Sequence, residues 1–340
     1  METIKLLSKH RKKTFSFLIL LAIVTIGISL SIGSVSIPVK DILKIIIHKF
    51  PLLNILIKGE SIQKYQLIIL RLRLPRILLA MLVGSGLATA GVAMQGLFKN
   101  PMASPYVVGV SSGSSFGAAL AILILPGIFS VPLLAFLTGL GAILLVYRIS
   151  RRNGKVPVET LLLAGIAIGF FFSAITSLLM YTSAQSVHYL VFWMMGGFGG
   201  RSWRHVVTAL PFIGFGIPAI YYFSRELNVM QLGEESATHL GVNVEKVKKL
   251  LLIFSSLITA AAVAVSGVIG FVGLIIPHIT RIIVGPDHRI LIPASALLGG
   301  IFLVWCDSLA RIVISPMELP IGIITSCFGA PFFIYLLKKK

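Results

Sequence analysis

Carboxylates are the side chains that most often couple a membrane protein to protons or sodium ions, so their positions come first. The chain has 11 acidic residues. All but one fall in expected loops or at the ends of expected membrane spans; they are Glu2, Asp41, Glu60, Glu159, Glu226, Glu234, Glu235, Glu245, Asp287 and Glu318. The exception is Asp307, which lies against the end of a span, with Arg311 one helical turn further on as its expected partner. Ion-coupled carriers keep carboxylates inside the bundle, so uphill transport by this chain would need energy from another subunit.

Motifs of catalysis and of metal or nucleotide binding are absent from the sequence. The string nearest to a Walker A motif, GVAMQGLFK at 91–99, has no lysine after its second glycine. No HExxH string occurs, and the seven histidines lack metal-ligand spacing. His278, beside Pro277, is better interpreted as a packing residue. We therefore expect no catalytic residue, no metal site, no cofactor and no enzymatic activity.

Arginines form a second group. Arg71, Arg73 and Arg76 precede one apolar segment, and Arg311 follows another. Arg73 and Arg76 are three residues apart and would share a helix face. Cations fixed at the outer mouth of a bundle can pair with the carboxylates of a docking protein. Ordinary snorkelling of arginine to the membrane interface is the alternative interpretation.

The longest polar interruption in the second half of the chain is Arg225–Lys249, here called the elbow. Gly233 is expected to open a short helix, with Glu234 and Glu235 in its first turn, where the positive helix end favours acids. Gly241 is suited to the position after a helix end, and Asn243 to the cap of a second helix. An ordered charged elbow between apolar halves would offer another protein a surface to bind, whereas a solvated loop is an equally good interpretation.

The composition defines the class of protein. Of the 340 residues, 56% are hydrophobic and 12% are charged, against about 45–50% and about 25% in soluble domains. The sequence therefore predicts an all-α polytopic membrane protein, with one transmembrane domain over residues 1–340 and the lipid bilayer as its environment. The net charge of +19 comes from basic residues beside apolar runs, where they set orientation rather than bind nucleic acid.

Apolar segments predict about ten spans of roughly 20 residues. Their expected ranges are 15–32, 75–97, 107–125, 131–147, 160–181, 206–223, 250–268, 270–284, 291–307 and 321–337. A half-length helix is expected at 187–198 and an amphipathic one around 39–50. Basic residues before the first span, in the loop 148–159 and at the end of the chain place both termini and the elbow in the cytoplasm.

Glycines and other small residues predict where helices approach closely. Gly84 with Ala88 and Ser295 with Gly299 are small pairs at helical spacing. Gly165, Gly169 and Ser173 form a third small stripe, on the span at 160–181. The Pro- and Gly-broken segment 98–112 must be covered by protein or line a cavity. Met94, Gln95 and Asn100 are candidates for lining a transport pathway.

Four long strings resemble the FecCD-type permeases, the membrane subunits of type II ABC importers for iron–siderophores, haem and vitamin B12. These strings are LRLPRILLAMLVGSGLATAGVAMQGLFKNPMASPYVVGVSSG, LGEESATHLGVN, GFVGLIIPHITRIIVGPDHRILIPASALLGG and ELPIGIITSCFGAPFFIYLL. They occur in one order, and the likeness covers about 31–340. It implies the type II ABC importer permease fold, with ten transmembrane helices per subunit in a dimer.

The resemblance also implies partners and sites. The partners would be a second permease subunit, as a homodimer, two ABC ATPase subunits that bind the ATP, and an extracytoplasmic solute-binding protein. The residues Leu232, Gly233, Glu234, Glu235, His239, Leu240 and Gly241 match the coupling helices that receive the ATPase. Arg73, Arg76 and Arg311 match arginines that pair with the binding protein. Val158, Glu159 and Thr160 match the cytoplasmic gate, where the vitamin B12 members carry small hydroxyl residues and this chain has Glu159.

The sequence therefore predicts a permease of the cytoplasmic membrane that carries a metal chelate such as an iron–siderophore, haem or cobalamin, powered by a separate ATPase. Small oxyanions are also carried within this family. Two other classes stay open at this point: an ion-coupled secondary transporter, and a polytopic membrane enzyme, against which stands the lack of any reactive constellation.

Overall fold

A computed structural model describes the chain except for residues 1, 34, 49–64, 153, 184–185 and 339–340. Throughout the described residues the regular structure is helical, apart from an isolated bridge between Arg152 and Lys155. The helices are α1 (Glu2–Ser31), α2 (Val39–His48), η2 (Ile68–Arg73), α4 (Leu74–Phe98), α5 (Val110–Ala119), η3 (Leu120–Ile124), α6 (Val131–Ser150), α7 (Val158–Thr182), α8 (Val187–Met194), α9 (Trp203–Tyr222), α10 (Ser224–Met230), α11 (Glu234–His239), α12 (Val244–Ser266), α13 (Val272–Val284), α14 (His288–Ala310) and α15 (Ile321–Lys338).

Each expected span falls on a helix. Within the described residues, seven helices are long and apolar enough to cross a membrane. Three expected spans correspond to the shorter apolar helices Val110–Ile124, Val272–Val284 and Ile321–Tyr335. The all-α polytopic class is thus confirmed, whereas the number of ten crossings stays a prediction.

The predicted start of the second span at Pro75 is wrong. The helix runs without a break from Tyr65 to Phe98, and its segment η2 has the wider π-helical turn. A proline inside a helix collides with the carbonyl four residues earlier. A π-turn just before Pro75 widens the backbone at this point, which allows the helix to continue through the proline.

The centre of the bundle is α4, which is packed against α9, α12, α13 and α14. In the most apolar windows of α4, α12 and α14, between 72% and 78% of residues are buried. The small pairs make the predicted close contacts: a Cβ added to Gly84 would lie 2.2 Å from the carbonyl oxygen of Gly299. One added to Gly91 would lie 1.9 Å from the carbonyl oxygen of Gly273. Backbones therefore touch along one side of α4, and only glycine fits there.

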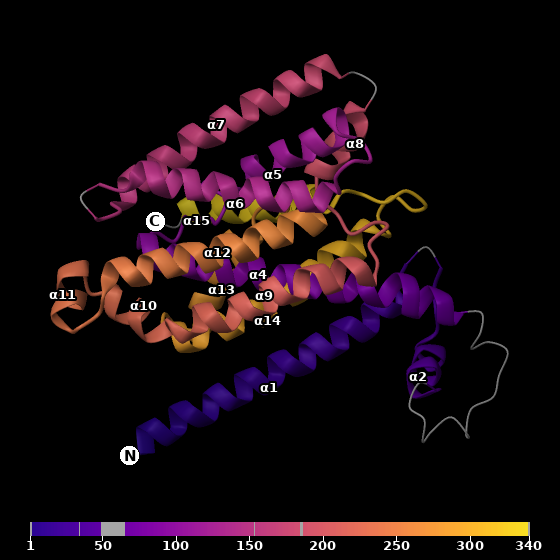
Figure 1. Cartoon of the computed structure of the whole chain (residues 1–340). Helices are drawn as coiled ribbons and strands as arrows, with labels where there is room; N and C mark the ends of the chain where they lie inside the picture. Colours follow the sequence, from indigo (N-terminus) through magenta and orange to yellow (C-terminus); the bar gives the residue numbers. More distant parts are fainter. Residues whose placement is uncertain (1, 34, 49–64, 153, 184–185, 339–340) are drawn as a thin grey trace.

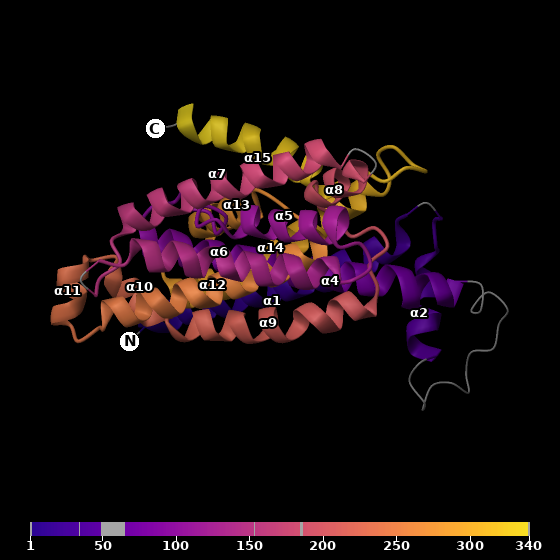
Figure 2. The same ribbon diagram turned by 45° about the horizontal axis from the view of Figure 1, so that its top comes forward.

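Helix α7 has the opposite character. Only 17% of its most apolar window is buried, and Figures 1 and 2 show it along the outside of the bundle. An apolar helix that is so little covered faces either lipid or another protein chain.

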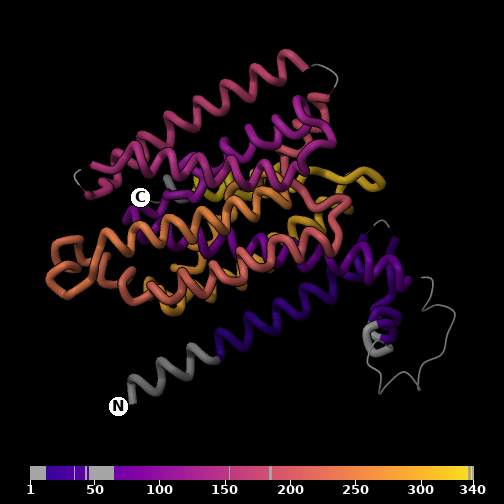
Figure 3. The backbone as a smooth tube through the Cα atoms, viewed as in Figure 1, coloured from indigo at the N-terminus to yellow at the C-terminus, as the bar shows by residue number. Residues whose placement is uncertain are grey.

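The two ends of the bundle differ in what they carry. Helices α10 and α11 lie at one end and α2 and α8 at the other (Figure 1), and the coloured part of α1 in Figure 3 runs toward the second of these ends. The predicted amphipathic and half-length helices correspond to α2 and α8. We call the two ends the elbow end and the α8 end.

Candidate functional site

The elbow is an ordered structure built by local capping. Gly233 precedes α11, and Glu234 and Glu235 occupy the first turn of that helix. Gly241 follows with a φ of 84°, the left-handed conformation that suits a helix end. Asn243 caps α12, with its side chain accepting from the backbone N–H of Lys246 at 3.1 Å. These predicted helix ends are confirmed, whereas the choice between a docking surface and a solvated segment stays a prediction. The elbow also contains a helix that the sequence analysis missed, α10, so it has three helical pieces rather than two.

The outer surface of the elbow combines leucines with charges. Leu232 is 70% exposed and Leu240 is 64% exposed. Glu235 and His239 are exposed between them. Glu234 forms an ion pair with Lys248 of α12, whose Nζ lies 2.7 Å from Glu234 Oε2. Exposed leucines surrounded by polar groups are typical of a surface that docks another protein.

The inner surface of the elbow is hydrogen-bonded to the transmembrane bundle. Gln231 Nε2 donates to the carbonyl oxygen of Gly96 at the end of α4 (2.9 Å). Asn228 Nδ2 donates to Asp287 Oδ1 in the turn between α13 and α14 (2.8 Å). The backbone N–H of Val156 donates to Glu245 Oε2 (3.1 Å), just before α7 begins. A displacement of the elbow would therefore act on three separate parts of the bundle.

The predicted gate residues lie in the first turn of α7. Glu159 is exposed, and Val158 is half-buried. Thr160 is turned toward α6, where its hydroxyl donates to the carbonyl oxygens of Pro157 (2.9 Å) and Ser150 (3.3 Å). The hydroxyl of Thr160 thus joins α7 to α6, and Glu159 is the exposed charged residue among the three predicted gate residues.

A groove runs beside α7 with a volume of about 620 Å³. Its walls come from the broken segment before α5, from α5 and α7, and from Met194 and Val268. Seven of its lining side chains carry hydroxyls: Tyr106, Ser111, Ser112, Ser115, Ser173, Thr176 and Ser177. All three residues of the predicted small stripe, Gly165, Gly169 and Ser173, line it, and Gly165 also lets α7 approach the backbone of Val107.

A second hollow of about 840 Å³ shares Met194 and Val268 with this groove and continues along α15. The side chains that line the two hollows include no Asp, Glu, Lys or Arg. Together they form what we call the uncharged face of the chain. This surface can bind a solute by hydrogen bonds and dispersion contacts, without ion pairing. In the part of the chain that is described, no three His, Cys, Asp or Glu side chains gather where they could hold a metal ion.

Of the three residues predicted to line a transport pathway, two do not line a cavity. Met94 and Gln95 are buried in the centre of the bundle. Gln95 donates to the carbonyl oxygen of Leu274 and accepts from Arg281. Asn100 is exposed beyond the end of α4, where its side chain accepts from the backbone of Met102.

The predicted docking arginines lie at the α8 end, where α1, α4 and α14 meet. Asp307 is 0% exposed, and Arg311 pairs with it at 3.2 Å as expected. Arg76 also binds Asp307, with Nε 2.9 and 3.1 Å from the two carboxylate oxygens. Its NH1 holds Glu318, at 2.8 and 3.0 Å. Two arginines thus compensate one buried carboxylate, which lies inside the last turn of α14 rather than against its end.

Arg73 and Arg311 are turned inward. Arg73 donates to the carbonyl oxygens of Leu30, Ser31 and Val35. Arg311 donates to the carbonyl oxygen of Ile32 and to Ser29 Oγ. Burial lowers the pKa of Arg311, and the Asp307 carboxylate opposes that shift. Arg73 and Arg311 are thus bound by acceptors at and just after the end of α1, which the sequence did not reveal. Docking of another protein at the three arginines stays a prediction. Glu318 is the exposed member of the cluster at 44%, and the side chain of its partner Arg76 is 11% exposed.

Comparison with known proteins gives a consistent result. The model of the FecCD transport family matches residues 20–339. The cobalamin import system permease protein BtuC of Halobacterium salinarum is 47% identical over 277 residues, which are 81% of this chain and 74% of that protein. The uncharacterized ABC transporter permease protein YvrB of Bacillus subtilis is 44% identical, over 96% of this chain and 92% of its own.

A solved structure is similar over almost the whole fold. It is a metal-chelate type ABC transporter in an inward-facing conformation. The TM-score is 0.84 and the sequence identity 35%, with 97% of this chain and 99% of that chain covered.

Proposed function

The chain belongs to the FecCD transport family, and from this premise we propose that it is the membrane permease subunit of an ABC importer for a metal chelate. The subunit itself breaks no bond, and ATP is bound and hydrolysed by separate partner subunits. The observation that carries the proposal is the elbow, which presents Leu232 and Leu240 outward and is hydrogen-bonded inward to three parts of the bundle. Such an element can receive a mechanical input and pass it on. The family does not favour the ion-coupled alternative.

The route from the elbow to the gate is short. Glu245 begins the last helix of the elbow and accepts from Val156, two residues before α7. Movement of an ATPase against α11 would pull this acceptor and with it the first turn of α7. The gate residues Val158, Glu159 and Thr160 lie in that turn. The exposed carboxylate of Glu159 would then meet solvent or its counterpart in a second subunit.

We assign the uncharged face to the transport pathway, completed by a second copy of this chain. Its support is the low burial of α7 together with the hydroxyl lining of the groove. A lining without charge suits a chelate whose periphery forms hydrogen bonds, and it offers no ion pair to a small oxyanion. Cobalamin, ferric chelates and haem are the cargo classes consistent with this surface.

We place the elbow end and both termini in the cytoplasm of the cell, as the basic loops suggest. The α8 end would then receive an extracytoplasmic solute-binding protein at the pair formed by Arg76 and Glu318. A carboxylate of that protein would have to displace Glu318 from Arg76 or join it there. Glu318→Gln should therefore strengthen docking, measured as the concentration of loaded binding protein that half-stimulates ATP hydrolysis, whereas unchanged stimulation would place the docking contact elsewhere.

Transport in proteoliposomes tests the proposal. The permease is reconstituted alone or with its ATPase subunits, with ATP enclosed and the binding protein outside. Cyanocobalamin, haem and a ferric hydroxamate are offered as cargo, and molybdate as the oxyanion. We expect accumulation only with ATPase and ATP, and of a chelate rather than of molybdate. Accumulation by the permease alone under a proton or sodium gradient would refute the proposal.

A matched pair of charge reversals tests the docking surface. Glu234→Lys with Glu235→Lys should reduce co-purification of the ATPase, since both residues lie in the first turn of α11. Arg151→Glu with Arg152→Glu changes the charge in the loop before α7, which lies at the elbow end but outside Arg225–Lys249. The ATPase should be retained by this second variant, and its equal loss from both variants would argue against a specific elbow contact.

A further inference from the structure

A second cavity, separate from the uncharged face, opens between α6, α9 and α12 at the α8 end. Its volume is about 500 Å³. It is lined by Ser130, Pro132, Leu133, Phe136, Leu137, Arg204, His205, Thr208, Phe212, Ala261, Ala264 and Val265. Neither the elbow nor the proposed pathway uses any of these residues. We call it the α9 groove.

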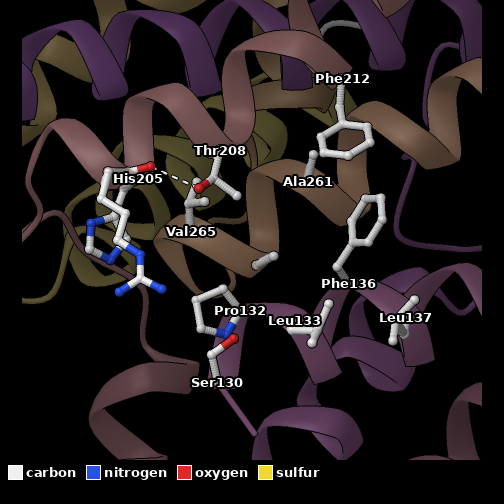
Figure 4. Close-up of a pocket in the computed structure, with 12 residues that line it drawn as sticks. Ser130, Pro132, Leu133, Phe136, Leu137, His205, Thr208, Phe212, Ala261 and Val265 are labelled. Carbon is white, nitrogen blue, oxygen red and sulfur yellow. Dashed lines mark hydrogen bonds between the residues drawn. The ribbon is translucent and has the colours of Figure 1, made fainter.

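The α9 groove is mostly apolar, and its polar lining residues are Ser130, Arg204, His205 and Thr208. In Figure 4, His205 and Thr208 lie at one end and the rings of Phe136 and Phe212 toward the other. The two ring centroids are 4.8 Å apart, so the rings contact each other there. From Arg204 to Phe212, α9 rises by about 12 Å. A chain of several methylenes can lie in a slot of this length and composition.

The outer end of the groove is cationic. Arg204 is exposed at the start of α9, and the NH1 of Arg201 lies 3.4 Å from His205 Nε2. Arg201 and Arg204 form no ion pair among the described residues, and no Asp or Glu lines the groove. The nearest candidate, Glu318, shares a small neighbouring hollow with Arg201 but is held by Arg76. Burial lowers the pKa of Arg201, as expected for a cation without a compensating carboxylate.

The surface around the opening is of the kind that faces lipid. On α9, Val207 is 64% exposed, Leu210 is 51% exposed and Phe215 is 62% exposed. Leu133 and Leu137, at the lip of the groove, are about half exposed. The opening lies where α6 and α9 begin and α12 ends. With these three helices as membrane spans, this level corresponds to the bilayer interface. An occupant that enters from this side comes from the membrane.

From this arrangement we propose that the α9 groove binds an anionic phospholipid, with one acyl chain between α6, α9 and α12 and the phosphodiester at Arg204 and Arg201. The apolar walls select a lipid over a free anion. The two unpaired arginines select an anionic headgroup over a zwitterionic one, and the start of α9 adds its own preference for negative charge. The site holds a lipid of the leaflet at the α8 end.

Photolabelling of the full-length permease in nanodiscs tests the site. Photoactivatable phosphatidylglycerol and photoactivatable phosphatidylcholine are compared, and labelled peptides are mapped by mass spectrometry. We expect phosphatidylglycerol to label α6 and α9 at the groove preferentially. Arg201→Gln with Arg204→Gln should reduce that preference by roughly tenfold or more, given the attraction of each arginine to an anionic headgroup. Arg151→Gln with Arg152→Gln, at the elbow end, should leave it intact.

A second pair of variants tests the apolar slot without touching the charges. Thr208→Trp fills the groove from an exposed position, and Val207→Trp places the same ring on α9 outside the groove lining. We expect only Thr208→Trp to abolish groove labelling. Soluble glycerophosphoglycerol should not compete with the lipid. Equal labelling by both lipids in the unmodified protein, or full competition by the soluble headgroup, would overturn the proposal.

Discussion

The hydrogen bond between Val156 and Glu245 links the elbow to the start of α7. Removing it should interrupt the proposed coupling while leaving the ATPase-docking surface on α11 and the gate residues of α7 unchanged. The backbone N–H of Val156 lies 3.1 Å from Glu245 Oε2, and the other carboxylate oxygen lies 3.4 Å from Lys248 Nζ. A hydrogen bond to a charged acceptor contributes about 1.5–3 kcal/mol. Glu245 is 33% exposed, so the lower end of that range applies. A loss of about 1.5 kcal/mol corresponds to roughly a tenfold loss of coupling.

Glu245→Ala should therefore lower the solute accumulated per ATP hydrolysed by roughly tenfold, while the amount of co-purified ATPase stays the same. The assay is paired measurement of uptake and phosphate release in proteoliposomes that contain the complete importer. Two conservative variants separate the contacts. Glu245→Gln keeps an acceptor for Val156 and loses the charge that faces Lys248. Glu245→Asp keeps the negative charge, but its side chain is one methylene shorter and should no longer reach the backbone N–H of Val156.

The expected order of coupling is unmodified protein, then Glu245→Gln, then Glu245→Asp together with Glu245→Ala. Coupling that fails in Glu245→Gln but persists in Glu245→Asp would assign the effect to Lys248 instead. Full coupling in Glu245→Ala would refute transmission through this link, and the elbow would then have to act through α4 or the turn between α13 and α14.

Three further outcomes are expected. Leu232→Ser with Leu240→Ser should weaken ATPase binding by roughly tenfold or more, since burying an exposed leucine contributes about 1.5–3 kcal/mol; a titration of ATPase onto the reconstituted permease measures it, and unaltered binding would exclude the leucines from the interface. Asp307→Asn should lower the free energy of unfolding in detergent by about 3–5 kcal/mol, because Arg76 and Arg311 lose the buried charge that compensates them. A thermal unfolding curve measures this, and an unchanged melting temperature would contradict a stabilising role of Asp307. Ser111→Val with Ser115→Val should slow chelate uptake while leaving basal ATP hydrolysis intact, and normal uptake would place the pathway elsewhere.

Local chemistry made the elbow predictable. Gly233, Gly241 and Asn243 act within a few residues of their own positions, so the helix ends they specify follow from sequence. The small pairs that include Gly84 and Gly299 were equally accessible, because small residues at helical spacing have few other uses in an apolar span. That these two glycines contact each other follows only from the structure. The helix α10 was missed because its polar residues lack both an apolar period and a side-chain cap.

The environment of the arginines was not predictable in the same way. Arg73 and Arg311 are bound by backbone carbonyls at the end of α1, far away in sequence. No motif signals a carbonyl acceptor, since every residue carries one. Likewise, an apolar residue such as Met94 on α4 could line a transport pathway or pack in the core, and the sequence does not distinguish the two. The packing of four helices around α4 shows that Met94 belongs to the core.

The backbone contacts of α4 have a mechanical consequence. Where Gly84 of α4 meets Gly299 of α14, and where Gly91 of α4 meets Gly273 of α13, the backbones touch with no side chain between them. Sliding by one helical turn would drive a bulkier neighbour into that space. We therefore expect α4, α13 and α14 to move as one rigid unit during transport, and α7, of which only 17% of the most apolar window is buried, to be less constrained by this chain.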